Sequence, residues 1–146
     1  MKDLYSNTEI VQVVAPVKVL DANVPAAVAK DLAGFNSAII EVSCGAKDAG
    51  DTGTITLKLE HADDNGSGAA GTYANVGAAD MLGVTPASGI VLTLAGGAVS
   101  AAVYKFGYVG GKRFLRFTLA ENDSNATGTI MAINLIKGHP LDAPVA

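Results

Sequence analysis

The stretch Thr54-Ile55-Thr56-Leu57-Lys58-Leu59-Glu60 alternates polar and apolar side chains at every step. Successive side chains of a β-strand point to opposite faces, so this period of two predicts a strand with one buried face. We expect Ile55, Leu57 and Leu59 to face a core, and the polar side chains between them to face outward.

The same pattern recurs near both ends of the chain. Arg113 to Leu119 alternates, with one face made of Leu115, Phe117 and Leu119. One side of an early segment is lined by valines, namely Val11, Val13, Val17 and Val19. Pro16 lies among them and has no amide hydrogen to donate, so this segment is predicted to be an edge strand or to be broken by a bulge.

Two runs, Ala38 to Cys44 and Thr129 to Ile136, are apolar on both faces. Such runs are typical of central strands whose two faces are both covered. Weaker strand candidates are Val28 to Leu32, Ile90 to Leu94 and Ala98 to Phe106. Together these segments make about eight short strands bounded by turn residues, which predicts an all-β fold, a β-sandwich of jelly-roll type.

Turn signals complete this outline. Gly96-Gly97 lies between two apolar runs and predicts a tight hairpin. Val76 to Gly83 is predicted to be the one short helix, ending at its glycine. Pro25 to Ala33 is rich in alanine and fits a short helix or a strand, and we favour a strand for its second half. Residues 1–146 are therefore predicted to form a single β-sandwich domain, with residues 1–15 as an N-terminal arm or edge strand.

The composition argues against charged partners. Ten Lys and Arg against fourteen Asp and Glu give a net charge of -4, which disfavours a general affinity for nucleic acid or anionic lipid. Only 16% of residues are charged, against a usual ~25%. Two explanations stay open: part of the surface is covered by protein partners, or Ala and Gly inflate the apolar fraction.

Cysteine usage indicates a reducing compartment. The single Cys44 cannot form an internal disulfide and lies in an apolar run, as a small buried residue would. Lys2 and Asp3 follow the first residue, and no apolar signal region comes after them. We expect synthesis in a cytoplasm, and no membrane partner, since no run approaches the roughly 18 apolar residues of a membrane span.

No motif predicts catalysis, a cofactor or a metal. Gly66 to Gly71 matches the G-x-G-x-x-G pattern, but no helix start follows it, so we interpret it as a flexible hairpin tip. The acidic turns at 48–51, 63–65 and 121–125 lack the ligand spacing of a calcium loop. His61 and His139 lack a recognisable cluster of further zinc ligands, and no G-x-S-x-G elbow occurs.

A small basic concentration lies beside aromatic side chains. Lys112, Arg113 and Arg116 stand near Tyr108 and Phe114. Cations beside stacking aromatics can bind single-stranded nucleic acid or sugar. Given the acidic total charge, we favour arginines that pair with carboxylates of a neighbouring strand or subunit.

Several segments resemble small virion proteins of tailed bacteriophages. The likeness rests on Gly107 to Arg116 together with the ending Gly138-His139-Pro140-Leu141. It extends to Leu57 to Asp64, which leads through glycine-rich sequence to Tyr73 to Val76, and to the opening Met1 to Tyr5. The resemblance covers most of the chain, but its motifs are structural and loosely specified.

The resemblance implies a non-enzymatic head decoration, or cement, protein on the capsid surface of the virion. Its partners would be the major capsid protein and copies of itself, as trimers, and its place of synthesis the cytoplasm of the bacterial host. Neither nucleic acid nor membrane is expected as a partner. Contacts with these partners are predicted at six residues: Ile10, Val11, Val14, Tyr108, Arg113 and Arg116.

Two alternatives remain at this stage. One is another virion component, such as a tail or head–tail connector subunit. The other is a carbohydrate-binding module on a jelly-roll scaffold, whose platform would be formed by Tyr73, Tyr104, Tyr108 or Phe114. The lack of Trp and the aromatic content of 5% count against this second alternative.

Overall fold

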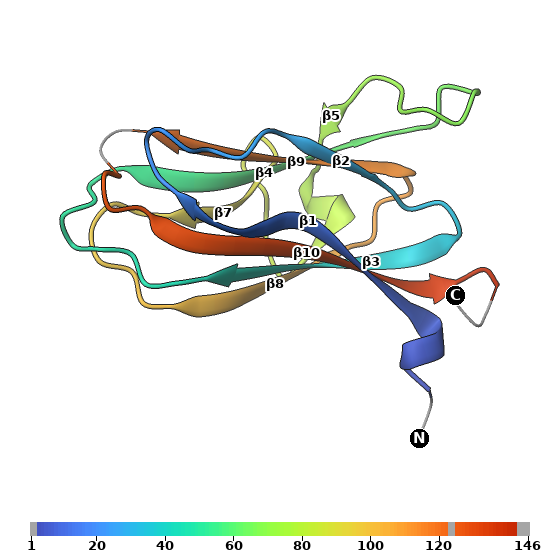
Figure 1. Ribbon diagram of the computed structural model, residues 1–146. Coiled ribbons are helices and arrows are strands. Elements are labelled where there is room, and N and C mark those ends of the chain that lie inside the picture. Colours follow the sequence, from blue (N-terminus) through green and yellow to red (C-terminus); the bar gives the residue numbers. More distant parts are fainter. Residues whose placement is uncertain (1–2, 123–124, 143–146) are drawn as a thin grey trace.

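Alternating hydrophobicity along the chain buries one face of most strands, and these faces meet between two antiparallel sheets (Figure 1). The computed structural model describes residues 3–122 and 125–142. Eight longer strands make up most of it: β1 (Thr8–Val19), β2 (Val28–Asp31), β3 (Phe35–Cys44), β4 (Thr54–Ala62), β7 (Ile90–Leu94), β8 (Ala102–Tyr108), β9 (Phe114–Asn122) and β10 (Thr129–Pro140). The smaller elements are two 3-10 helices and two short strands: η1 (Tyr5–Asn7), β5 (Ala74–Asn75), η2 (Ala78–Asp80) and β6 (Met81–Leu82).

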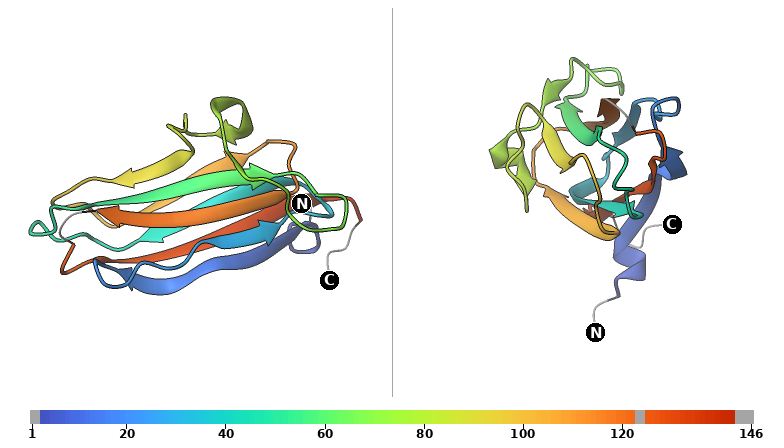
Figure 2. Two further views of the ribbon diagram at one scale, coloured as in Figure 1. Left: turned by 90° about the horizontal axis from the view of Figure 1, so that it is seen from above. Right: turned by 90° about the vertical axis from the view of Figure 1, so that its left-hand side faces the viewer.

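The sheet order is that of a jelly roll. The first sheet, here the β1 sheet, has the order β1-β10-β3-β8-β6. The second, the β2 sheet, has the order β2-β9-β4-β5, and β7 also pairs with β4. The chain thus passes repeatedly from one sheet to the other between its long strands, and Figure 2 shows the two resulting layers. The predicted all-β sandwich is confirmed.

The core lies where the alternating pattern places it. Ile55, Leu57 and Leu59 of β4 are at most 1% exposed. Their counterparts on β9 are also buried, namely Leu115, Phe117 and Leu119. Burying a large aliphatic or aromatic side chain contributes roughly 1.5–3 kcal/mol, so these two strands anchor the β2 sheet to the core.

Strand β1 is both an edge strand and an irregular one. It pairs only with β10 among the described strands, and its register shifts between Gln12 and Val14 and again between Val14 and Val17. Pro16 lies within the second shift, where no ladder amide is required. The prediction for this segment is confirmed, and residues 1–2 of the proposed arm lie outside the described residues.

Three local predictions have different outcomes. The prediction of a hairpin at Gly96-Gly97 was wrong, because β7 and β8 do not pair with each other. β7 pairs with β4 in one sheet, and β8 pairs with β3 in the other. The chain here crosses between sheets, and the Gly97 amide donates to the carbonyl of Asp51, at 2.8 Å. The predicted helix from 76 to 83 is reduced to the three residues of η2. The strand predicted in the second half of 25–33 is confirmed as β2.

Candidate functional site

An apolar row crosses the outer face of the β1 sheet through all five strands. Ile10 of β1 lies opposite Ile136 of β10, which lies opposite Ile39 of β3. Ile39 in turn lies opposite Gly107 of β8, and Gly107 opposite Leu82 of β6. Directly opposed residues of an antiparallel ladder point to the same face, so these five residues, the apolar row, form one continuous strip.

Much of this apolar surface is open to solvent. Ile10, Ile39 and Leu82 are 69%, 38% and 59% exposed. Further along the same face, Val103 of β8 and Ile130 of β10 are 69% and 58% exposed. The prediction that β3 and β10 are covered on both faces was therefore wrong: both are central strands, but only their inner faces are buried by the described chain.

The outer face of the β2 sheet is different in character. The outward positions of β4 are polar throughout, from Thr54 to Glu60, and β9 adds Arg116 and Thr118. Arg116 binds Glu60 at 2.7 Å, and its guanidinium lies over the ring of Tyr73, 4.2 Å from the ring centroid. This face is suited to water, so the exposed apolar side chains distinguish the β1 sheet.

A groove opens where helix η1 meets the outer face of the β1 sheet. It encloses about 620 Å³, and Ile39 and Ile136 of the apolar row line its sheet side. Leu4 and His139 are among the residues that line its other parts. Figure 1 shows η1 projecting beyond the body of the sandwich on this side. The groove therefore extends the apolar row toward the N-terminal helix.

Helix η1 is organised by its own side chains. Asn7 Nδ2 donates to the Asp3 carbonyl at 2.6 Å, and Thr8 Oγ1 donates to the Leu4 carbonyl at 2.8 Å. The hydrogen bond from Ser6 lowers the pKa of the Asp3 carboxyl below its usual value. The helix buries none of its three residues, so packing against the core does not hold it in place.

Ser37 and His139 form a hydrogen-bonded pair in the groove. Ser37 Oγ lies 2.7 Å from His139 Nδ1. A serine nucleophile also needs a group that orients its histidine. Among the described residues, no carboxylate lies within ion-pair distance of His139. The pair carries no assignable catalytic role, and the absence of enzymatic activity stays a prediction.

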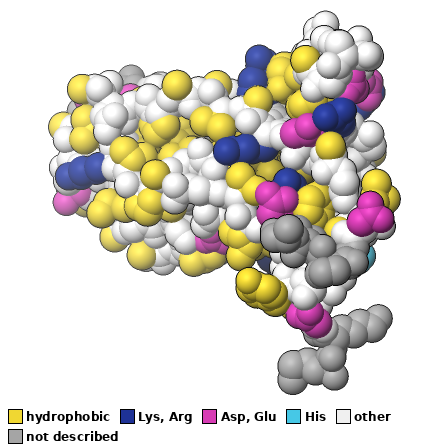
Figure 3. All heavy atoms as spheres, turned by 45° about the vertical axis from the view of Figure 1, so that its right-hand side comes forward, with side chains coloured by type: hydrophobic (Ala, Val, Ile, Leu, Met, Phe, Trp, Pro, Cys, Tyr) yellow, Lys and Arg dark blue, Asp and Glu magenta, His cyan; other side chains and the backbone are white. Residues whose placement is uncertain are grey.

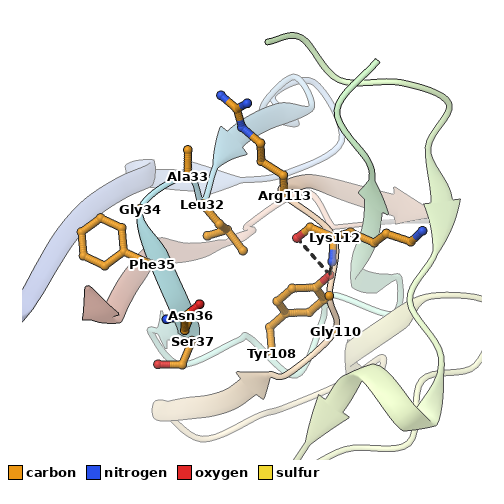
Figure 4. Close-up of a pocket in the computed structure, with 11 residues that line it drawn as sticks. Leu32, Ala33, Gly34, Phe35, Asn36, Ser37, Tyr108, Gly110, Lys112 and Arg113 are labelled. Atoms are coloured by element: carbon orange, nitrogen blue, oxygen red, sulfur yellow. Dashed lines mark hydrogen bonds between the residues drawn. The ribbon is translucent and has the colours of Figure 1, made fainter. Parts of the chain in front are cut away.

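A second, smaller cavity lies at the same end of the molecule (Figure 4). It encloses about 310 Å³ between segments 32–37 and 108–113. Figure 4 shows the side chains of Lys112 and Arg113 pointing away from the ring of Tyr108. The two cations thus do not point at the Tyr108 ring, which lines the cavity together with Leu32 and Phe35.

The basic residues beside this cavity are already paired. Arg113 binds Asp31 through two hydrogen bonds, Nε to Oδ1 at 2.9 Å and Nη2 to Oδ2 at 2.7 Å, and also pairs with Asp64. The hydrogen bond from Arg113 is the main cause that lowers the pKa of Asp31. Lys112 pairs with Asp63. Figure 3 shows basic and acidic side chains next to one another on this side. The predicted pairing with carboxylates of neighbouring strands is confirmed, and neither cation is free to bind an anion.

Tyr108 is a structural residue of the core. It is 2% exposed, its Oη lies 3.0 Å from His61 Nδ1, and it accepts a hydrogen bond from the Lys112 amide at 3.2 Å. Burial raises the pKa of its hydroxyl to about 12. Tyr108 thus ties the 108–112 turn to β4.

The six predicted partner contacts are placed in different environments. Ile10 lies on the outer face, in the apolar row. Val11 lies opposite Leu135 on the inner face, and Val14 is 6% exposed. With Tyr108 also buried and both arginines in ion pairs, Ile10 is the one predicted contact we retain. Sequence reasoning missed the remaining apolar residues of this face: the exposed Ile39, Leu82, Val103 and Ile130, and the half-buried Ile136.

Residues 3–122 and 125–142 contain neither a cluster of metal ligands nor a membrane-spanning helix. No group of three or more His, Cys, Asp or Glu residues there is placed to hold a metal ion. None of the helices described is long and apolar enough to cross a membrane. The acidic turn at 121–125 lies partly outside the described residues.

Comparison with known proteins gives remote likenesses only. No protein-family model matches the chain, and no curated protein matches it. The crystal structure of the SPBc2 prophage-derived protein YomS is similar at 10% identity and a TM-score of 0.44, over 90% of this chain and 94% of that chain. A truncated AlyQ with CBM32 and alginate lyase domains is similar at 12% identity and a TM-score of 0.20, over 90% of this chain and 34% of that one. Likenesses this distant support no conclusion about function.

Proposed function

We propose that this protein is a non-enzymatic structural component of a tailed-phage virion, a decoration or cement protein that binds the assembled head. The resemblance of its sequence segments to small virion proteins supports this class. The observation that carries the proposal is the contrast between the two outer faces, one polar and one with exposed apolar side chains across five strands. We assign the outer face of the β1 sheet as its partner-binding surface.

Such a surface stabilises a shell without chemistry. Apolar area removed from water contributes roughly 25 cal/mol per Å², and a ligand that binds only the assembled state stabilises that state by mass action. The exposed side chains lie on hydrogen-bonded strands, so little backbone conformational freedom is lost on binding. The proposed partners are the major capsid protein and copies of the chain itself, at the surface of the virion.

The outer face carries two apolar regions. The apolar row lies next to the groove, and Val103 and Ile130 lie further along β8 and β10. Between them runs a polar row in which Gln12, Asn134, Glu41 and Lys105 lie opposite one another in turn. We assign the region of Val103 and Ile130 to the contact with the shell.

Co-sedimentation with purified heads that lack the protein tests this function. We expect the unmodified protein to bind in many copies and to raise the temperature at which the heads release their DNA. The double variant Val103→Asp, Ile130→Asp should lose binding, because each carboxylate would have to be desolvated at the interface. Thr93→Asp, an exposed position on the polar outer face, should bind normally.

The outcome also separates the alternatives. Unmodified protein that never sediments with heads removes the decoration role. A handful of copies at one vertex would indicate a connector instead. The carbohydrate-binding alternative has little support. Tyr108 and Phe114 are buried, Tyr104 packs partly buried against the core, and Tyr73 is covered by Arg116.

A further inference from the structure

We infer that the groove beside η1 is filled by the N-terminal helix of another copy of this chain. The inference rests on the proposed function, since it names the partner at one end of the same binding face. It assigns the groove and the apolar row to self-association, and leaves Val103 and Ile130 to the shell.

Helix η1 presents an exposed apolar projection. Tyr5 is 89% exposed and Leu4 is 72% exposed. A tyrosine ring supplies a large apolar contact area with a polar tip, which suits it to an interface. Tyr5 does not line the groove of its own chain, although Leu4 does. The described residues of its own molecule therefore leave the Tyr5 side chain almost wholly exposed to solvent.

The groove has the complementary shape and chemistry. Its volume of about 620 Å³ is within the ~300–1,000 Å³ of ligand pockets, so the groove has room for an aromatic ring. Ile39 and Ile136 supply apolar contacts, and Ser37 and His139 supply polar atoms for a tyrosine hydroxyl. A Tyr5 ring from a second copy would thus cover both its own exposed surface and the groove.

Position on the molecule favours a second copy over an unrelated partner. Projection and groove share helix η1, so a symmetric arrangement buries both at once and repeats the same contact. The groove is continuous with the apolar row through Ile39 and Ile136, which extends the contact to Ile10. One surface patch therefore contains both halves of the contact.

The area involved predicts a reversible association. The apolar row is one outward residue wide, which is about 6.6 Å along each strand, so five strands about 4.8 Å apart give a flat strip of about 160 Å². Even with the groove and η1 added, the contact stays below the ~1,200 Å² of standard interfaces, as in weak and transient associations. We expect dissociation constants toward the upper end of the micromolar range and tighter association on the shell, where several contacts act together.

Sedimentation velocity on the free chain, without heads, tests the inference. Between about 1 and about 200 µM, the mass should rise from 14.7 kDa to a multiple of that value. The multiple gives the copy number, two for a pair and three for the trimer that the resemblance implies. Tyr5→Ser and Ile10→Asp should each stay at 14.7 kDa. Val103→Asp is the matched control, because Val103 and Ile10 are equally exposed at 69% on the same face, and it should associate like the unmodified chain.

Two results would overturn the inference: an unmodified chain that stays monomeric throughout, or association that survives both Tyr5→Ser and Ile10→Asp. Both substituted residues are exposed, and an unchanged urea midpoint confirms that each variant is folded. Because no shell is present, failure here leaves head binding intact. Conversely, a chain that associates but never binds heads contradicts the proposed function alone.

Discussion

Ile39 and Ile136 lie opposite each other on β3 and β10, and both point away from the core. Their chain neighbours Ile40 and Leu135 are also opposed and are 0% exposed, in the centre of the sandwich. These two isoleucines of central strands therefore lie on the outer surface and not in the core.

This relationship predicts unequal effects of one substitution at adjacent positions. Ile40→Ala should lower the free energy of unfolding by about 2–5 kcal/mol, because it leaves a cavity in the core. Ile39→Ala should lower it by less than about 1 kcal/mol, since Ile39 is 38% exposed on the outer face. Urea unfolding of both variants measures the difference, and equal losses would mean that the outer face is covered within the folded chain.

The close packing of Gly53 predicts a second contrast. A Cβ at Gly53 would lie 2.2 Å from both the Asn122 carbonyl oxygen and Asn125 Nδ2, so Gly53→Ala should destabilise the protein by about 1–3 kcal/mol or more. Nothing lies within 4 Å of a Cβ at Gly111, so Gly111→Ala should change stability little. Thermal unfolding compares the two variants, and a neutral Gly53→Ala would contradict the packing of this end.

A third loss of stability is expected when the buried cation of Lys47 is removed. It is 3% exposed, and its Nζ donates to the carbonyls of Asp51 and Gly53 at 2.5 and 2.8 Å. Lys47→Met keeps the apolar stem but leaves the buried Gly53 carbonyl without this donor, whereas the Asp51 carbonyl still accepts from the Gly97 amide. An unpaired buried carbonyl costs about 1–3 kcal/mol, so denaturant unfolding should show a loss of this size. Lys105 is exposed and is therefore not an equivalent control in burial. Lys137→Met is the matched comparison, because it removes a buried lysine that pairs with Glu9 at the opposite end.

The Arg113–Asp31 pair predicts an acid-dependent stability. Since the folded chain lowers the pKa of Asp31 below its usual 3.8, the pair contributes stability above about pH 4. That contribution should disappear as the pH falls through the lowered folded value. As the pH is lowered from about 5 through the pKa of Asp31, the free energy of unfolding should therefore fall less in Asp31→Asn than in the unmodified protein. Urea titrations at a series of pH values measure this difference. An identical pH profile in both proteins would show that the pair is not coupled to folding.

The sequence was most informative where one face of a strand is polar. The alternation around Leu57 determines which side chains are buried, because a register shifted by one residue would expose the apolar side chains to water and bury the polar ones. It was misleading for β3 and β10, where Ile39 and Ile130 make the outer face resemble an inner one. Burial by a partner and burial within the chain leave the same pattern, so only the arrangement of strands separates them.

The groove could not be predicted from the sequence, because its position also depends on the arrangement of the strands. Leu4, Ser37 and His139 come from distant segments, and only the pairing of β10 with both β1 and β3 brings them together. The ion pairs of Arg113 were anticipated in kind, from the acidic total charge, but the particular partner Asp31 follows from the pairing of β2 with β9.

Electron cryomicroscopy of heads reconstituted with this protein tests the central claim most directly, since it reveals which sheet faces the shell. The end of the β1 sheet's outer face that carries Val103 and Ile130 should contact the capsid surface, with Thr93 and Arg116 directed to solvent. A map in which the β2 sheet lies against the shell, or in which the heads carry no added density, would contradict the account.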